Sequence, residues 1–166
     1  MRSLIRKIID SISYLRLKFK GVKFGKAVDL INVRFMIIGE NVSFGNNVRL
    51  QASNKIVVMD NSYIGHNNHI YGGNIIIGKD FMSGPNVCIM AGNHGKKLGI
   101  PMNKQDTNSI GIIIGDDVWV GSNSTILDGV RVGDHVVIGA GSVVTRDLPK
   151  FSICVGNPAH PVSYRI

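Results

Sequence analysis

One histidine of this sequence lies at the point where a six-residue repeat of aliphatic residues is interrupted. His94 follows Gly92 and Asn93, and it precedes a polar stretch, residues 95–113, that contains Pro101 and indicates a loop. A neutral imidazole accepts a proton near pH 7, so His94 could act as a general base towards an attacking hydroxyl group. A lone histidine is more often structural or simply exposed, and the residues alone leave both interpretations open.

Other candidate ligands and nucleophiles are weaker. His66 and His69 are three residues apart, a spacing that could hold a metal, but no third ligand stands near them in the sequence. A position at a turn explains both, and we expect no metal. Cys88 and Cys154 are too few for a disulfide scaffold and lack the spacing of a zinc module, so packing is the favoured role for both.

A six-residue rule governs residues 114–149 without a gap. An isoleucine or valine recurs at every sixth position and is usually followed by glycine. A small or aliphatic residue stands four positions after each isoleucine or valine. The aliphatic positions are Ile114, Val120, Ile126, Val132, Ile138 and Val144. Neither the period of a flat strand nor that of a helix explains this spacing, whereas stacked coils of short strands do.

The same repeat recurs less regularly upstream, for example at Ile38, Ile64 and Ile77. Between these positions its spacing shifts by one or two residues. We therefore predict an all-β fold in which residues 21–150 form a parallel β-helix with about 18 residues in each coil. The loop over 95–113 interrupts it, and residues 151–166 form a C-terminal tail. Loops on a rigid scaffold often carry function, which makes the position of His94 at the root of this loop notable.

The N-terminal segment differs from the rest. Apolar residues recur at three- and four-residue steps over residues 1–20, which predicts a short amphipathic α-helix. Eight of the 19 lysines and arginines lie within residues 1–26 beside a single acidic residue, Asp10. The helix either packs on the body or on a partner subunit, or it lies on an anionic membrane surface. The remaining chain is nearly neutral, which argues against a nucleic-acid partner.

Composition bounds the remaining alternatives. The chain has 166 residues, of which 44% are hydrophobic and 18% charged, and this suits one domain with a real core. No apolar run approaches the ~20 residues that a membrane-spanning helix needs. We expect a cytoplasmic protein, or one attached peripherally to the cytoplasmic face of the inner membrane through residues 1–20.

The run IGDDVWVGSNSTILDGVRVGDHVVIGAGSVVTRDLP, followed by FSICVGNPAHPV, resembles the hexapeptide-repeat acyltransferases. Within that family it is most similar to the galactoside, maltose and polysaccharide O-acetyltransferases. The resemblance is specific over residues 114–162 and weaker over residues 28–92. It implies a left-handed parallel β-helix, a homotrimer with active sites between subunits, and acetyl-CoA as the donor.

The resemblance also implies roles for single residues. His94 matches the catalytic histidine of the family. The residues that match contacts to coenzyme A are Trp119, Ser122, Ala140, Thr145 and Arg146. Trp119 could instead simply pack on the outer face of the fold. The position of the family's acceptor-binding asparagine falls near Gly65 here, and Asn67 is close to it but displaced. Asn67 and Asn93 are the two candidates for contact with the acceptor.

Three hypotheses about function follow from these matches. The first is an acetyl-CoA-dependent O-acetyltransferase acting on a sugar hydroxyl of a saccharide or a cell-surface polysaccharide precursor. The second is an N-acetyltransferase of an amino sugar, such as a nucleotide sugar. The third is a non-catalytic or metal-dependent β-helix protein. The sequence alone does not identify the acceptor.

Overall fold

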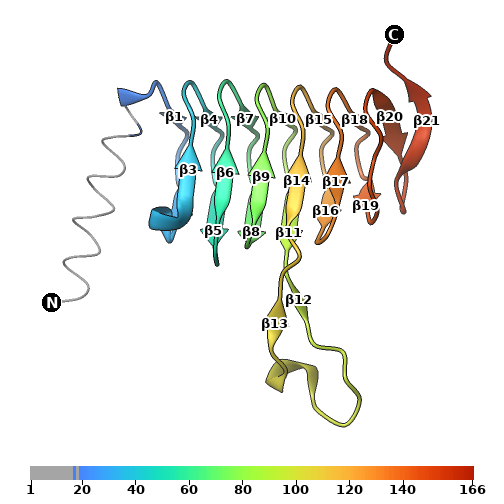
Figure 1. Ribbon diagram of the computed structural model, residues 1–166. Helices are drawn as coiled ribbons and strands as arrows, with labels where there is room; N and C mark the ends of the chain where they lie inside the picture. The colour runs from blue at the N-terminus through green and yellow to red at the C-terminus, as the bar shows by residue number, and fades with distance from the viewer. Residues whose placement is uncertain (1–16, 18) are drawn as a thin grey trace, which may run out of the picture.

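The chain winds into a triangular prism with one sheet on each side, whose strands are parallel except for the last strand of the chain (Figure 1). The computed structural model describes residue 17 and residues 19–166. Most of the helix predicted over residues 1–20 therefore lies outside the described residues. Within them, no helix is long and apolar enough to cross a membrane. The all-β parallel β-helix predicted from the six-residue rule is confirmed.

Three sheets, here named A, B and C, follow one another in each coil. Sheet A contains β1 (Lys23–Phe24), β4 (Ser43–Phe44), β7 (Tyr63–Ile64), β10 (Met82–Ser83), β15 (Trp119–Val120), β18 (Val137–Ile138), β20 (Ser152–Val155) and β21 (His160–Tyr164). Sheet B contains β2 (Asp29–Ile31), β5 (Arg49–Ala52), β8 (His69–Gly72), β11 (Cys88–Ala91), β16 (Thr125–Leu127) and β19 (Val143–Val144). Sheet C contains β3 (Met36–Ile38), β6 (Ile56–Val58), β9 (Ile75–Ile77), β14 (Ile112–Ile114) and β17 (Arg131–Val132). We call the turns between them the A–B, B–C and C–A edges.

Aliphatic side chains stacked along the prism axis form the core. Ile56, Ile75 and Ile112 pair in parallel register on sheet C, and each is fully buried. Alternate strand residues face outward because successive side chains in a strand point to opposite sides. One coil buries too little apolar surface to be stable, so stability depends on contacts between neighbouring coils.

The predicted coil of about 18 residues is wrong for the N-terminal half. Side chains at equivalent turns are 20 residues apart there, as for Asn54 and Asn74, and 18 apart near the C-terminus, as for Ser124 and Ser142. The difference arises partly on sheet B, where β5 and β8 have four residues each but β16 and β19 have three and two.

Asparagines at the edges adopt left-handed backbone conformations. Asn47, Asn67, Asn86 and Asn123 have φ between 56° and 60°, a region that asparagine tolerates better than most other residues. Asn47 Nδ2 donates to Asn67 Oδ1 at 3.0 Å, and Asn86 Nδ2 donates to Asn123 Oδ1 at 3.1 Å. These bonds along the A–B edge connect neighbouring coils, so the turn residue also contributes to stacking.

A hairpin leaves the prism at the B–C edge, in place of the loop predicted over residues 95–113 (Figure 1). Its antiparallel strands are β12 (Asn93–His94) and β13 (Thr107–Asn108), and the 3-10 turn η2 (Met102–Lys104) lies near its tip. Another short 3-10 turn, η1 (Val33–Phe35), precedes β3. The chain is back in the prism at β14, which pairs with β9 and β17. The 36 residues that obey the rule downstream are therefore separated from the upstream coils by an insertion.

The C-terminal residues fold back onto the last coils. β20 pairs with β18 in parallel, and β21 then pairs with β20 in the antiparallel direction. Beyond β21, Arg165 Nη1 donates to Asp117 Oδ2 at 2.9 Å. The same carboxylate oxygen lies 2.9 Å from His135 Nδ1, so one aspartate joins the C-terminus to the C–A edge.

Replacing Asp117 with asparagine is expected to lower the melting temperature at pH 7 but not in acid. The hydrogen bond with His135, and after it the charge and hydrogen bond of Arg165, hold the pKa of Asp117 below its usual 3.8. A carboxyl group with a lowered folded-state pKa contributes stability above its unfolded pKa and loses it as the pH falls through the folded value. Thermal melts at pH 7 and at about pH 2.5 test this sign.

Asp80→Asn is the matched control, because Asp80 occupies the same edge with φ 56°. The control should melt like the wild type at both pH values. An Asp117→Asn deficit that is equally large in acid would show that the carboxylate charge is not its cause.

Candidate active site

His94 is exposed at the root of the hairpin, beside a groove of about 230 Å³ between the hairpin and the prism. It lies in β12 and pairs with Thr107 of β13. The groove is lined by four residues that carry hydroxyl groups, namely Ser53, Tyr71, Thr107 and Ser109. Among the described residues, no lysine or arginine lines it. The groove therefore offers a candidate base beside neutral hydrogen-bonding groups, which suits a ligand rich in hydroxyls.

Asn93, predicted to contact the acceptor, has its amide nitrogen engaged. Asn93 Nδ2 donates to Asp128 Oδ2 at 2.7 Å. The Asp128 carboxylate also accepts the backbone N–H groups of Ile110 and Gly111, at 2.8–3.0 Å. The sequence interpretation missed Asp128, because an Asp-Gly pair after an aliphatic run indicates only a turn.

Three of the predicted donor-site residues lie on sheet A or at the A–B edge. The Trp119 side chain is on the outer surface of β15 with 49% of its area exposed, so it is not part of the core. Ser122 and Ala140 follow in successive coils. A Cβ added to Gly121 would meet Ala140 N at 2.5 Å, so the two coils approach here as closely as glycine permits.

The other two donor-site residues, Thr145 and Arg146, are exposed at the B–C edge beyond β19. Arg146 has no ion pair among the described residues, which leaves its guanidinium available to an anion. His94 shares this edge, whereas Asn67 lies at the A–B edge between β7 and β8. A single chain therefore does not bring the predicted site residues together, because sheet B lies between the A–B edge and the B–C edge.

His66 lies at a turn as predicted, whereas the turn position predicted for His69 is wrong because His69 begins strand β8. His66 Nδ1 accepts the backbone N–H of Asn46 at 2.8 Å, on the edge of the preceding coil. His69 lies on sheet B, where burial and then the charge of Arg49 lower its pKa, and its buried Nε2 has no hydrogen-bond partner in the described part of the chain. Among the described residues, no three histidine, cysteine, aspartate or glutamate side chains come together as a metal site.

Both cysteines are poor candidate nucleophiles. The Cys88 side chain is half-buried on sheet B, and Cys154 is fully buried in β20. Burial raises the pKa of both thiols, and the thiolate is the reactive form. Their environments therefore favour the packing role that the sequence indicated.

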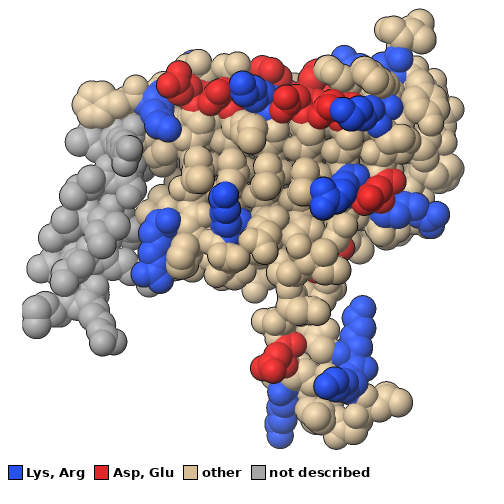
Figure 2. Space-filling view, in the orientation of Figure 1, with Lys and Arg blue, Asp and Glu red and all other residues tan. Residues whose placement is uncertain are grey.

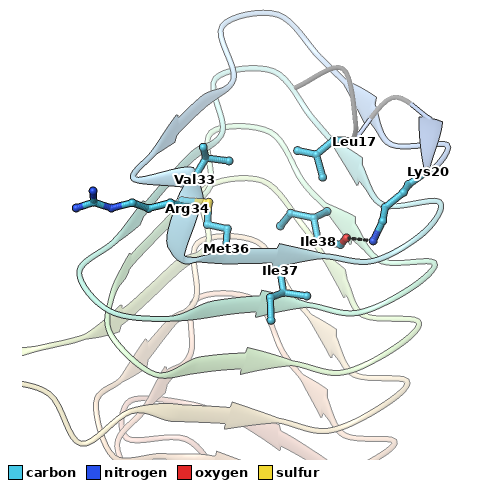
Figure 3. A pocket seen from close by; sticks show the side chains of 7 residues that line it. All are labelled: Leu17, Lys20, Val33, Arg34, Met36, Ile37 and Ile38. Carbon is cyan, nitrogen blue, oxygen red and sulfur yellow. Dashed lines mark hydrogen bonds between the residues drawn. The ribbon is translucent and has the colours of Figure 1, made fainter. Parts of the chain in front are cut away.

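A larger hollow, of about 330 Å³, lies at the N-terminal end of the prism (Figure 3). Its lining is mostly apolar and includes Leu17, Val33 and Ile38, whose side chains Figure 3 labels. Lys20 Nζ donates to the Ile38 carbonyl at 3.2 Å. No acid, histidine or hydroxyl lines this hollow among the described residues, so the smaller groove beside His94 is the better site for chemistry.

The charged side chains are unevenly distributed over the prism. Figure 2 shows acidic residues in a row along the edge opposite the hairpin, which is the C–A edge. Asp60, Asp116 and Asp134 of this edge each accept a backbone N–H of a neighbouring coil at 2.7–3.1 Å. These carboxylates are thus engaged in stacking and lie away from His94.

The chain is similar to named transferases. A family model described as "Bacterial transferase hexapeptide (six repeats)" matches residues 111–146. The galactoside O-acetyltransferase of Escherichia coli is 33% identical over 138 residues, covering 82% of this chain and 68% of that protein. The chain spans between 42% and 68% of the length of five curated relatives that it matches.

Solved structures share the fold. AntD, an N-acyltransferase from Bacillus cereus in complex with dTDP and 3-hydroxybutyryl-CoA, superposes with a TM-score of 0.79 at 24% identity, covering 89% of this chain and 81% of that one. A maltose O-acetyltransferase from Clostridium difficile gives 0.57 at 27% identity, covering 86% and 66%. At such identity the likeness to AntD concerns the fold alone.

Proposed function

Since the chain belongs to the hexapeptide-repeat acyltransferase family, we propose that it transfers an acetyl group from acetyl-CoA to a hydroxyl group of a saccharide. The observation that carries this proposal is the exposed His94 beside a groove lined by neutral hydroxyl side chains. The galactoside O-acetyltransferase relative supports the same reaction class.

His94 is the base in this proposal. Its imidazole takes the proton from the acceptor hydroxyl as the oxygen forms a bond with the carbonyl carbon of the donor. The carbon–sulfur bond of the thioester then breaks, and the imidazolium returns the proton to the leaving sulfur, so coenzyme A is released as the thiol and no covalent intermediate with the enzyme is needed. The donor supplies the acyl group as a thioester. Ser53, Tyr71 and Thr107 hydrogen-bond other hydroxyls of the acceptor and orient it towards His94.

We propose an uncharged saccharide, rather than a nucleotide sugar, as the acceptor, on the basis of the part of the groove that one chain supplies. A nucleotide sugar carries a diphosphate, for which proteins usually provide arginine, lysine or backbone N–H groups. The described lining has no lysine or arginine, and its polar side chains are largely hydroxyls and amides. N-acylation of an amino sugar is the second candidate reaction. The following test distinguishes it from O-acetylation.

The test is release of coenzyme A from acetyl-CoA in the presence of neutral saccharides, amino sugars and nucleotide sugars. We expect neutral saccharides to give the highest kcat/KM, and NMR of the product to show an ester on a sugar oxygen. Acceleration by nucleotide-linked amino sugars alone, with an amide product, would contradict O-acetylation while leaving acyl transfer intact. No acceleration with any acceptor would contradict both.

We expect the protein to be a homotrimer. His94 and Arg146 are on the B–C edge, whereas Trp119 and Ser122 are on sheet A and the A–B edge. A threefold assembly that sets the B–C edge of one protomer against sheet A of the next would complete a site from both halves. Light scattering should give three times the 18.0 kDa chain mass, and a monomer at micromolar concentration would contradict this arrangement.

A further inference from the structure

We propose that Asp128 is a positioning residue that sets where His94 stands, by holding both ends of the hairpin on one carboxylate. Asp128 lies between β16 and β17, at the B–C edge of the next coil, and it is half-buried. Asn93 is the residue immediately before His94 on the outgoing strand, and Ile110 and Gly111 lie on the returning segment. The catalytic consequence of this contact rests on the function proposed above.

The contacts with Asp128 are short and converge. Its Oδ2 accepts Asn93 Nδ2 at 2.7 Å and Ile110 N at 3.0 Å. Its Oδ1 accepts Gly111 N at 2.8 Å and is also 3.0 Å from Ile110 N. Three N–H donors thus share one carboxylate, and both of its oxygens accept hydrogen bonds. Hydrogen bonds to a charged acceptor are stronger than those between neutral groups.

Other contacts do not replace Asp128 on the outgoing strand. Ser109 Oγ donates to the Gly73 carbonyl at 2.9 Å, and Gly129 N donates to the Gly111 carbonyl at 2.8 Å, but both bonds hold the returning segment. Towards the tip, Gln105 Nε2 donates to the carbonyls of Lys97 and Ile100 within the hairpin itself. Among the described residues, the Asn93 side chain thus makes a direct hydrogen bond between the prism and the strand that carries His94, which is otherwise held by its pairing with β13.

Asp128→Ala is expected to lower kcat for acetyl transfer by about 10–100-fold, because misplacing a catalytic group by about 1 Å costs this order of rate. The KM for acetyl-CoA should stay within about twofold, since the predicted donor contacts lie elsewhere. Asn93→Ala should have a similar effect, and the double variant should lose no more than the larger single loss, because both remove the same link.

Asp116→Ala is the matched control. Its carboxylate likewise accepts a backbone N–H of a neighbouring coil, that of Lys79 at 2.7 Å, but at the opposite C–A edge. We expect its kcat to match the wild type even where its melting temperature falls. Three results would overturn the positioning role of Asp128: kcat of Asp128→Ala within about twofold of wild type, an increase confined to the acetyl-CoA KM, or additive losses in the double variant.

Hydrogen–deuterium exchange of the trimer or monomer without substrate separates this inference from the proposed function. In Asp128→Ala, amides of residues 93–111 should exchange faster than in the wild type and in Asp116→Ala, while those of β18 and β20 stay unchanged. Unchanged exchange at Ile110 and Gly111 would overturn the link itself. If the wild type transfers acetyl to no acceptor, the proposed function fails, and faster exchange still establishes that Asp128 holds the hairpin root.

Discussion

Replacing His94 with alanine is expected to lower the acetyl-transfer turnover by about 10²–10⁴-fold, the usual range for loss of a general base. His94 is exposed at the hairpin root and is the histidine that lines the groove. The affinity for coenzyme A, measured by calorimetry, should change little, because the residues assigned to the donor are on other coils. The loss should therefore appear in kcat at saturating donor and acceptor.

His160→Ala is the control for histidine removal in general. His160 is exposed in β21 and its ring lies 3.2 Å from the Pro158 carbonyl, so the substitution alters the C-terminal strand and leaves the groove intact. Its turnover should match the wild type. Turnover near wild type in His94→Ala would exclude His94 as the base and direct attention to the hydroxyl residues of the groove.

Replacing Gly72 with alanine is expected to cost about 2–5 kcal/mol of folding free energy. Gly72 ends β8 with φ 122°, and a Cβ built there would overlap the carbonyl oxygen of Ala91 in the next coil. Both the positive φ and the steric overlap oppose a side chain, and Ala91 is backbone that does not rotate away. The melting temperature and urea midpoint should both fall.

Gly141→Ala separates the two contributions to that loss. Gly141 also has a positive φ, 71°, but apart from its chain neighbours no atom of the described residues lies within 4 Å of a Cβ added there. It should lose only the cost of the left-handed backbone, about 1–2 kcal/mol. An equal loss at both glycines would mean that the coils separate enough to remove the overlap at Gly72.

Much of the fold was predictable because the rule repeats. Ile114, Val120 and the later aliphatic positions face one core in coil after coil, so each repeat supports the same interpretation. The resemblance to hexapeptide-repeat acyltransferases is confirmed by the family model and by the E. coli relative. Coil length was harder, since it depends on extra residues in sheet B strands such as β5, which an aliphatic repeat does not register.

The site was predictable only in part. His94 stood out because the six-residue repeat stops beside it, whereas Trp119 was identified through the resemblance to the hexapeptide-repeat acyltransferases. Asp128 contacts Asn93 across 35 residues and an inserted hairpin, so no local spacing relates the two. The roles assigned to His94, Asn67, Asn93 and the donor-site residues stay predictions, because they concern contacts with molecules and subunits beyond a single chain.

The insertion of the hairpin at one edge has a consequence for how such proteins can change. β11 pairs with β8 and β16 in unbroken parallel register on either side of it, so the prism stacks as though the hairpin were absent. Among the described residues, the side-chain hydrogen bonds of the tip, from Lys96 to Gln105, stay within the hairpin, so substitutions there leave the contacts between coils untouched. The sequence of the tip can therefore vary at little cost to the stability of the prism, whereas substitutions in the coils disturb the contacts that hold neighbouring coils together.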